Sequence, residues 1–386
     1  MTPSGEGGAG EGGPGEGIPG AGRPGEGLAR LLAALPIPIL QAPMVGASLD
    51  GLAAAVSAAG GMGALAAGAL APEAIGPAVA RVRAATDAPF AVNLLMAPRG
   101  DPAPGEVAAA LAQLTPWYAQ LGLEPPEAPN SFAPDFDAQL EAVIAASPPA
   151  ASFTFGILDR PRVARLRARG TLVIGTATTV AEARAWAEAG ADGICAQGFE
   201  AGGHRGHFLA DPEASLVGTL ALVATIRSAV DLPVIAAGGI MDGRGVAAVL
   251  ALGAAAAQMG TAFLLADEAT TSRPWRGAIE RAGDDATRLT RAFTGRHARG
   301  IENRFMRLMH GVQDEVPAYP VQNRLTQPLR AAAAQADEPE MISLWAGQGV
   351  ALARPGQAAG MLRAWWDEAG EAARMLASRT ERKDGS

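Results

Sequence analysis

A glycine-rich stretch with two histidines, CAQGFEAGGHRGH at residues 195–207, carries the side chains best suited to chemistry. A short run of β character at residues 193–196 ends within this stretch. Its glycines let the backbone turn sharply and offer N–H groups to a ligand. His204 can exchange a proton near neutral pH. The stretch predicts the C-terminal end of a strand with a ligand-binding loop and a candidate base. The alternative is a tight loop with a surface histidine.

The chain around this stretch alternates short apolar strands with helical segments. Eight strands are predicted, at residues 36–42, 64–67, 89–95, 150–155, 172–176, 193–196, 233–237 and 255–259. Strands that alternate with helices are typical of an α/β fold with a parallel sheet. Eight such units favour a closed (β/α)8 TIM barrel, and an open doubly wound sheet is the alternative.

Composition divides the chain into four parts. Residues 1–26 are almost entirely Gly, Pro and Glu, which predicts a disordered tail. We expect residues 27–265 to form the barrel, with a Pro-rich insertion at about 98–138. Residues 266–345 are rich in arginine and predict a smaller, mostly helical second domain on the substrate side. Residues 346–386 predict a C-terminal helical segment with a charged tail.

Charge and composition exclude several classes of partner. The net charge is −8 and the pI is about 5.2, so neither nucleic acid nor a membrane surface is an expected partner. The single cysteine, Cys195, allows no disulfide within the chain, and with four histidines it forms no zinc-binding spacing; we expect no metal. No apolar stretch is long enough to span a membrane and no signal peptide is evident, so we expect a cytoplasmic protein.

The residues just past the strand ends form the active-site face of a barrel. Here they are uncharged amides and glycine turns: Pro43, Met44, Asn93, Gln197, Gly238, Gly239 and residues 258–261. Phosphate in such barrels often binds after strands seven and eight, which places it at Gly238–Gly239 and Gly260–Thr261. The amides of Asn93 and Gln197 suit the edge of a heteroaromatic ring, or they satisfy loop backbone.

Other motifs give weaker indications of function. Residues 61–66 (GMGALA) resemble a dinucleotide fingerprint, but they follow a helix and precede a strand, the reverse of what that site requires. No phosphate-binding GxxxxGK[ST] loop occurs. Glu200 is expected to pair with a nearby arginine rather than act as an acid. Most arginines after residue 266 are expected to be solvated or structural, and one or two could face an anionic substrate.

Seven motifs together resemble a known family. They are QAPM at 41–44, FAVN at 90–93, AQGFEAGGHRG at 196–206, PVIAAGGI at 233–240, QMGT at 258–261, ARGIENRF at 298–305 and SLWAGQG at 343–349. In this order they are similar to the bacterial, FMN-dependent branch of the nitronate monooxygenases. That resemblance implies an FMN-binding barrel with an added smaller domain.

The resemblance also implies roles for individual residues. His204 matches the family's catalytic histidine. The residues implied to bind FMN are Pro43, Met44, Asn93, Gln197, Gly202, Gly203, Gly238, Gly239, Gln258, Met259, Gly260 and Thr261. The implied reaction oxidises an alkyl nitronate, or a nitroalkane after His204 takes its α-proton. Molecular oxygen completes it, and the products are a carbonyl compound and nitrite.

Two further function classes stay open on these motifs. One is an FMN-dependent NAD(P)H reductase of the same superfamily, acting on an enoyl-acyl-carrier-protein or a quinone. The other is a flavin-binding sensor or a structural barrel. This chain departs from many relatives at Thr154, where they have histidine, and at Asn323 and Gln327, where some have tyrosine and lysine. These departures concern the substrate pocket.

Overall fold

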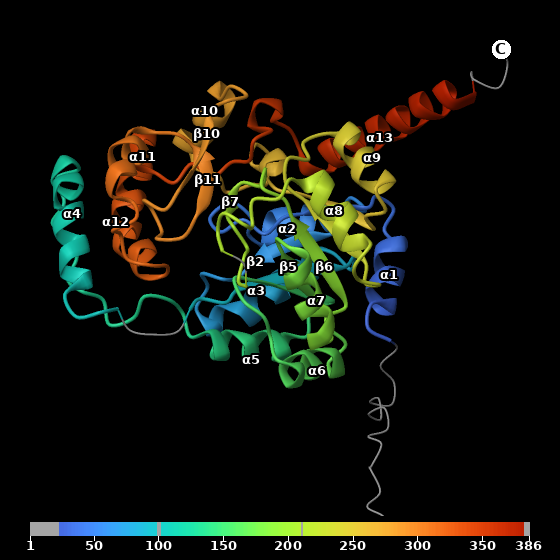
Figure 1. The fold of residues 1–386 in the computed structure, drawn as a ribbon, viewed down its shortest axis with the longest axis horizontal. Helices are drawn as coiled ribbons and strands as arrows, with labels where there is room; N and C mark the ends of the chain where they lie inside the picture. Colours follow the sequence, from blue (N-terminus) through green and yellow to red (C-terminus); the bar gives the residue numbers. More distant parts are fainter. Residues whose placement is uncertain (1–22, 99–101, 210, 382–386) are drawn as a thin grey trace, which may run out of the picture.

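A computed structural model describes residues 23–98, 102–209 and 211–381 of the chain. Eight parallel strands form its centre and alternate with helices (Figure 1). The strands are β1 (Ile39–Gln41), β2 (Gly63–Ala66), β3 (Phe90–Leu95), β4 (Ala150–Thr154), β5 (Leu172–Ala177), β6 (Gly193–Gln197), β8 (Val234–Ala237) and β9 (Ala256–Met259). They coincide with the eight stretches that the sequence predicts, because short, buried, apolar runs between helices are a strong local signal.

The strand order shows that the sheet is a barrel. The strands follow one another as β1-β9-β8-β6-β5-β4-β3-β2, and every neighbouring pair is parallel. The two ends of this order meet where Leu40 bridges Met62, and the N–H of Gln41 donates to the carbonyl of Met62 at 3.0 Å. This closure confirms the predicted (β/α)8 barrel over the open sheet, since an open sheet leaves its two edge strands apart.

Helices cover the outside of the barrel. They are α2 (Asp50–Ala58), α3 (Pro72–Ala85), α5 (Phe136–Ala146), α6 (Arg160–Ala168), α7 (Val180–Ala189), α8 (Thr219–Arg227) and α9 (Gly243–Ala251). The long C-terminal helix α13 (Ala358–Glu381) packs its first half on α9 and α2, where Leu362 and Trp365 are buried. No helix of the described residues, α13 included, has the length and apolarity needed to cross a membrane.

A helix that the sequence did not predict closes the bottom of the barrel. The described residues of the predicted disordered tail, 1–26, are only its last four, and Glu26 already begins α1 (Glu26–Ala33). Leu28 and Leu32 of α1 are buried with the side chains of the barrel interior. Leu28 lies over Gly193, at the start of β6, so closely that a Cβ there would be 2.2 Å from its methyl group. The opposite, C-terminal mouth is left for the site.

The chain after β9 forms a second lobe beside the barrel. Its elements are η1 (Thr261–Phe263), α10 (Arg273–Arg281), β10 (Thr287–Thr290), β11 (Ala298–Ile301), α11 (Arg304–Met309), η2 (His310–Val312), α12 (Val321–Gln335), η3 (Pro339–Met341) and η4 (Val350–Leu352). The lobe has its own apolar core, which includes Phe293, Phe305 and Leu325. The lobe therefore contains helices and a β-hairpin, whereas the sequence showed only the helical pattern.

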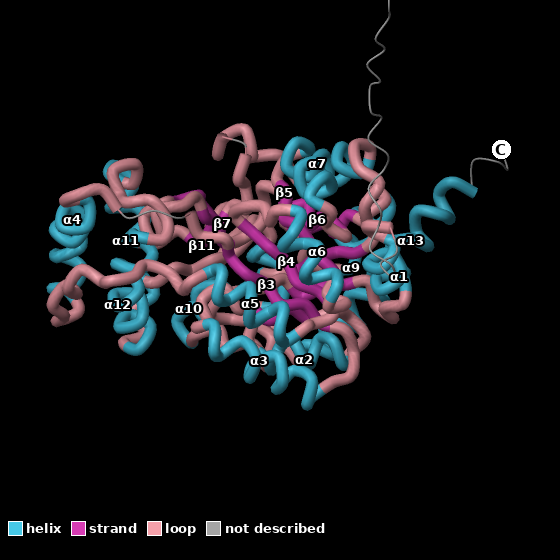
Figure 2. Tube along the Cα trace, turned by 90° about the horizontal axis from the view of Figure 1, so that it is seen from below, coloured by secondary structure: helices cyan, strands magenta, loops and turns pink. Residues whose placement is uncertain are grey.

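The insertion after β3 packs with this lobe and not on the barrel. Its helix α4 (Glu106–Gln120) lies beside α11 and α12 in both views (Figures 1 and 2). The tilted rings of Trp117 and Phe305 pack with centres 4.8 Å apart, and the Tyr118 hydroxyl donates to the carbonyl of Leu325 at 2.6 Å. These contacts join segments about 200 residues apart in sequence, so no local pattern predicts them.

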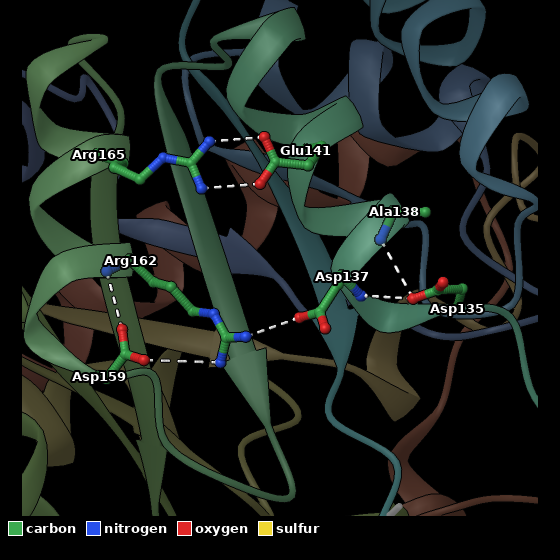
Figure 3. A network of polar contacts seen from close by, with 7 residues as sticks. All are labelled: Asp135, Asp137, Ala138, Glu141, Asp159, Arg162 and Arg165. Carbon is green, nitrogen blue, oxygen red and sulfur yellow. Dashed lines mark hydrogen bonds and ion pairs between the residues drawn. The ribbon is translucent and has the colours of Figure 1, made fainter.

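A network of charged side chains links α5 to α6 on the outer surface (Figure 3). Arg165 binds Glu141 through two hydrogen bonds of 2.8 and 2.6 Å, and Arg162 binds Asp137 at 2.8 Å. Both partners of the Arg165–Glu141 pair are about half exposed. Exposed pairs of this kind contribute about 0–1 kcal/mol each. The network therefore adjusts how two outer helices meet and has no part in the site.

We predict that α1, the helix that closes the bottom of the barrel and so acts as a plug, contributes strongly to stability. Leu28→Ala removes a fully buried side chain and leaves a cavity over Gly193, so the free energy of unfolding should fall by about 2–5 kcal/mol. Arg30→Ala, on the exposed face of the same helix, is the matched control and should change it by less than about 1 kcal/mol. Urea unfolding followed by circular dichroism measures both. Equal effects of the two substitutions would show that α1 does not act as a plug.

Candidate active site

One cavity of about 630 Å³ opens at the C-terminal ends of the strands. The sequence-predicted residues that line it are Pro43, Met44, Asn93, Gln197, Gly202, Gly203, His204, Gly238, Gly239, Gln258, Gly260 and Thr261. Met259 does not line it. Its side chain belongs to the apolar layer between barrel and helices, because neighbouring residues of a strand point to opposite faces. Side chains from the lobe, among them Tyr319, Arg330 and Trp345, form the remaining wall.

The side chain of Gln197, at the start of the glycine loop after β6, holds the backbone near the loop's other end. The amide nitrogen of Gln197 donates to the carbonyl of His204 at 3.0 Å, and its amide oxygen accepts from the N–H of Gly206 at 2.7 Å. Gln197 therefore satisfies the loop's backbone while it lines the cavity. Asn93 is similarly engaged, since its amide nitrogen donates to the carbonyl and hydroxyl of Ser152 at 3.2 and 3.0 Å.

A buried arginine supports the loop from behind, and sequence reasoning did not single it out. Arg205 is fully buried, and its guanidinium donates to the carbonyls of Gly198 at 2.6 Å, Gln197 at 3.2 Å and Ser215 at 2.8 Å. Burial, and then the nearby Arg299, lower the pKa of Arg205 to about 10. Arg205 therefore stays charged at neutral pH, and it joins two carbonyls of the glycine loop to the carbonyl of Ser215.

Glu200 behaves differently from the sequence expectation of an arginine pair. Both of its carboxylate oxygens accept from the N–H of Thr219, at 3.0 and 2.9 Å, and one also accepts from the Thr219 hydroxyl at 2.8 Å. Thr219 is the first residue of α8, where backbone N–H groups lack partners within the helix. A carboxylate is stabilised there by the helix dipole. Glu200 thus anchors the glycine loop to a helix N-terminus.

The catalytic candidate His204 lies on a strand formed across the two lobes. β7 (Gly203–His204) pairs antiparallel with β11, with His204 opposite Ala298 and Gly203 opposite Arg299. β11 also pairs with β10, which completes a three-stranded sheet. The backbone of the glycine loop is therefore bonded to the second lobe on one side and to Arg205 on the other. No sequence pattern indicated this two-residue strand.

Aromatic rings and one hydroxyl fix the imidazole of His204. Its Nε2 lies 2.9 Å from Oγ1 of Thr294. The rings of Phe155, Tyr319 and Trp345 surround it with centres 5.5, 5.7 and 5.5 Å away. The Thr294 hydroxyl can donate to the carbonyl of Arg296 at 3.2 Å. When it does, Nε2 must be the donor in the bond to Thr294, and Nδ1 is the nitrogen free to accept a proton.

This surrounding keeps the imidazole neutral. Burial is the largest cause, and the charges of Arg296 and Arg330 add to it, so the pKa of His204 is lowered to about 3. A lowered pKa means that the neutral ring is favoured at physiological pH. His204 is accordingly available to accept a proton but holds it weakly until a negative charge enters the cavity.

Two guanidinium groups near His204 lack an acidic partner. Arg296 stacks over the ring of Phe155 at 4.3 Å and donates to the carbonyls of Arg205 and His207. Arg330 lines the cavity from α12, and its strongest contacts are to the carbonyl and amide oxygens of Asn323 at 2.9 and 2.8 Å. Within the described ranges neither guanidinium forms an ion pair. Their charge is therefore left to act on the contents of the cavity.

Most other arginines of the lobe have structural contacts, as expected. Arg299 stacks over Phe199 at 4.3 Å and is buried, and Arg276 binds the carbonyls of Leu265 and Ala266 at 2.8 and 3.0 Å. Arg330 was not among the arginines considered from the sequence. It lies four residues past Thr326 in a helix, and nothing local distinguishes it from a solvated side chain.

The three positions that depart from the family pattern all face the cavity. Thr154, Asn323 and Gln327 line it, and the Thr154 hydroxyl lies 3.0 Å from that of Thr176. All three side chains are uncharged, and two of them accept from arginines that also line the cavity: Asn323 from Arg330 and Gln327 from Arg324.

Comparisons with known proteins agree with this geometry. The model of the nitronate monooxygenase family matches residues 29–365. The chain belongs to the nitronate monooxygenase family. Probable nitronate monooxygenases of Staphylococcus aureus strain Newman and Staphylococcus saprophyticus are each 42% identical to it, over 273 and 272 residues, which are 70% of this chain and 77% of theirs. It is therefore an oxidoreductase.

Solved structures support the same assignment. Nitroalkane oxidase from Streptomyces ansochromogenes is 44% identical, with a TM-score of 0.84 over 90% of this chain and 99% of that one. FabK from Thermotoga maritima is 30% identical, with a TM-score of 0.70 over 91% and 98%. Together the comparisons support oxidation of nitro compounds by a TIM-barrel enzyme, and a flavin-dependent oxidoreductase is consistent with this family.

The lowered pKa of His204 predicts a signature in acid stability. The unfolded chain binds a proton on this residue near its ordinary pKa of 6.5, whereas the folded chain does so only near 3. Stability is therefore unaffected above pH 6.5 and falls as pH decreases toward 3, by at most about 1.4 kcal/mol per pH unit for this group. In His204→Asn that contribution is absent, so less stability should be lost between pH 7 and pH 5.

Urea unfolding at the two pH values measures the difference. His310→Asn, which removes an exposed imidazole, is the matched control and should lose as much stability as the unmodified protein. The opposite result, a larger loss in His204→Asn than in the unmodified protein, would mean that the imidazole is charged in the folded state.

Proposed function

We propose that this protein binds FMN and uses molecular oxygen to oxidise alkyl nitronates, and more slowly nitroalkanes, to carbonyl compounds and nitrite. The observation that carries the proposal is the set of residues that line one cavity. Two glycine turns suited to a phosphate, a set of uncharged amides, a neutral histidine and the guanidinium of Arg330 all face it. The guanidinium of Arg296 stacks on Phe155, which also lines the cavity. Membership of the nitronate monooxygenase family supports oxidation of nitro compounds.

The residues of the cavity fit FMN. Gly238 and Gly239 follow β8 with φ angles of 119° and 70°, a left-handed backbone that exposes N–H groups and that other residues rarely adopt. Gly260 and Thr261 follow β9 beside them. The Thr261 hydroxyl is nearly buried, and the described residues offer its proton no acceptor. A phosphate is an acceptor that would satisfy it.

The other predicted residues would hold the remainder of the cofactor. Asn93, Gln197 and Gln258 would meet the polar edges of its ring or ribityl chain, and Met44 and Gly202 would form walls. Bound there, FMN supplies the redox chemistry, while the protein orients and shields it.

His204 and the two cations favour an anionic substrate. A nitronate carries a negative charge, and Arg296 and Arg330 stabilise that charge in a poorly hydrated cavity. The same charge raises the pKa of the neighbouring imidazole, which then donates a hydrogen bond to the bound anion. A neutral nitroalkane must first lose its α-proton to His204. This transfer is slow because the imidazole holds a proton weakly, so we assign His204 as a base that acts best on strongly acidic substrates.

We predict that His204→Asn separates the two substrates. Asparagine can still hydrogen-bond an anion but cannot take a proton, so turnover of neutral nitroethane should fall by about 10²-fold or more. Turnover of ethyl nitronate should fall by about tenfold or less, since only a positioning contact changes. Nitrite release measures both, with the flavin absorbance of each preparation used to normalise for cofactor. Unchanged nitroethane turnover would remove His204 as the base.

A further inference from the structure

One turn of the second lobe reaches the phosphate end of the proposed cofactor site. We infer that this turn, residues 346–349, is part of the phosphate site and that Gly347 positions the Thr261 hydroxyl toward the phosphate. The inference rests on the proposed function, because it assumes that the ligand is FMN. On this inference the second lobe helps to bind the cofactor, and it also forms part of the wall of the substrate cavity.

Backbone hydrogen bonds dock the turn onto the barrel. The N–H of Gly347 donates to Oγ1 of Thr261 at 2.9 Å, and the N–H of Gln348 donates to the carbonyl of Glu200 at 2.9 Å. The turn thus bridges two loops, one after β9 and one after β6. Both loops carry residues proposed to bind FMN.

The bond from Gly347 decides where the Thr261 hydroxyl points. A hydroxyl has one proton to donate and two lone pairs that accept. Gly347 itself lines the cavity and occupies one of these lone pairs, so the proton of Thr261 is directed away from Gly347. The described residues offer that proton no acceptor, and Thr261 lines the cavity. An oxygen of an anion in the cavity would meet a donor that is already oriented.

Glycine is required at this contact because backbone meets backbone. A Cβ on Gly347 would lie 2.7 Å from the carbonyl oxygen of Glu200 and 3.1 Å from the nitrogen of Gly202. A Cβ on Gly202 would in turn lie 2.5 Å from the nitrogen of Gly347. A side chain at residue 347 must therefore push the turn away from Thr261 or displace the glycine loop.

The residue just before this turn touches the catalytic candidate. Trp345, two residues before Gly347, packs its ring against that of His204 at 5.5 Å. One short segment therefore contacts the phosphate donor and the imidazole. Binding of the phosphate should consequently hold the lobe in the position that surrounds His204.

Binding of FMN and of riboflavin to the full-length apoprotein tests the inference. Riboflavin lacks the phosphate and serves as the matched ligand. For Gly347→Ala we expect the Kd of FMN to rise about tenfold or more, as for a lost hydrogen bond to a charged group. The Kd of riboflavin should change by less than about twofold. Gly360→Ala, whose Cβ meets nothing within 4 Å, is the control and should leave both values unchanged.

A second set of variants shows whether Gly347 acts through Thr261. Thr261→Val should raise the Kd of FMN, and Thr261→Ser should restore it. Adding Gly347→Ala to Thr261→Val should have little further effect, because residues that act through one another are not additive. Flavin fluorescence quenching measures each Kd, and apoprotein melting curves show that each variant folds. If Gly347→Ala does not fold, two other results test the inference. They are the recovery of FMN affinity in Thr261→Ser and the ratio of the Kd values of FMN and riboflavin in Thr261→Val.

Three results would overturn this inference while the proposed function stands. The first two are an unchanged FMN affinity in Gly347→Ala and equal losses of affinity for FMN and riboflavin. Full loss of FMN on adding Gly347→Ala to Thr261→Val would also do so, since the two effects would be independent. If the unmodified protein bound neither flavin, the proposed function itself would fail and this inference with it.

Discussion

The pairing of β7 with β11 is the constraint on which the rest of the site depends. It consists of two residues on each side, yet it joins the glycine loop of the barrel to the hairpin of the second lobe. Without it, the loop would be fixed by Arg205, Gln197 and Glu200 but would not be bonded to the hairpin. With it, His204 is placed between a barrel mouth that can take a flavin and a lobe that supplies aromatic rings and cations. The site exists only where the two lobes meet.

The charge states of the ionisable side chains around His204 then follow from burial and not from an acidic partner. Burial is the first cause of the lowered pKa values of His204, Arg296 and Arg330. The two guanidiniums nevertheless stay charged, since their pKa values of about 10 are far above neutral, whereas the imidazole becomes neutral. The cavity is therefore net positive around a neutral histidine. That arrangement favours an anion, which in the function proposed above places nitronates before nitroalkanes.

The sequence predicted the barrel and most of the site because both depend on local patterns. Strands such as β5 and β8 are short apolar runs ended by glycine or a helix, and residues at their C-terminal ends must share one face. Thus the sequence alone could assign Asn93, Gln197 and Thr261 to one site, although they are far apart in the chain. Met259 was grouped with them by its motif, although the alternation of a strand turns its side chain outward.

What the sequence did not predict depends on contacts between distant segments. α4 joins the lobe through Tyr118 and α12, and β7 exists only because β11 lies beside it. Arg330 has no distinguishing neighbour in sequence, and its place in the cavity follows from how α12 is oriented. Glu200 was expected to pair with an arginine, because nothing in its own loop indicates that the N-terminus of α8 lies within reach. Such pairings are set by the closed fold as a whole.

Anaerobic stopped-flow absorbance tests the central claim most directly. The purified protein is mixed without oxygen, in separate experiments, with propyl nitronate and with NADH. The account predicts loss of the flavin absorbance with nitronate and none with NADH, followed by its return when oxygen is admitted. Loss with NADH alone would contradict the account and indicate a reductase of the same superfamily. A protein without any flavin spectrum would contradict the assignment of the cavity itself.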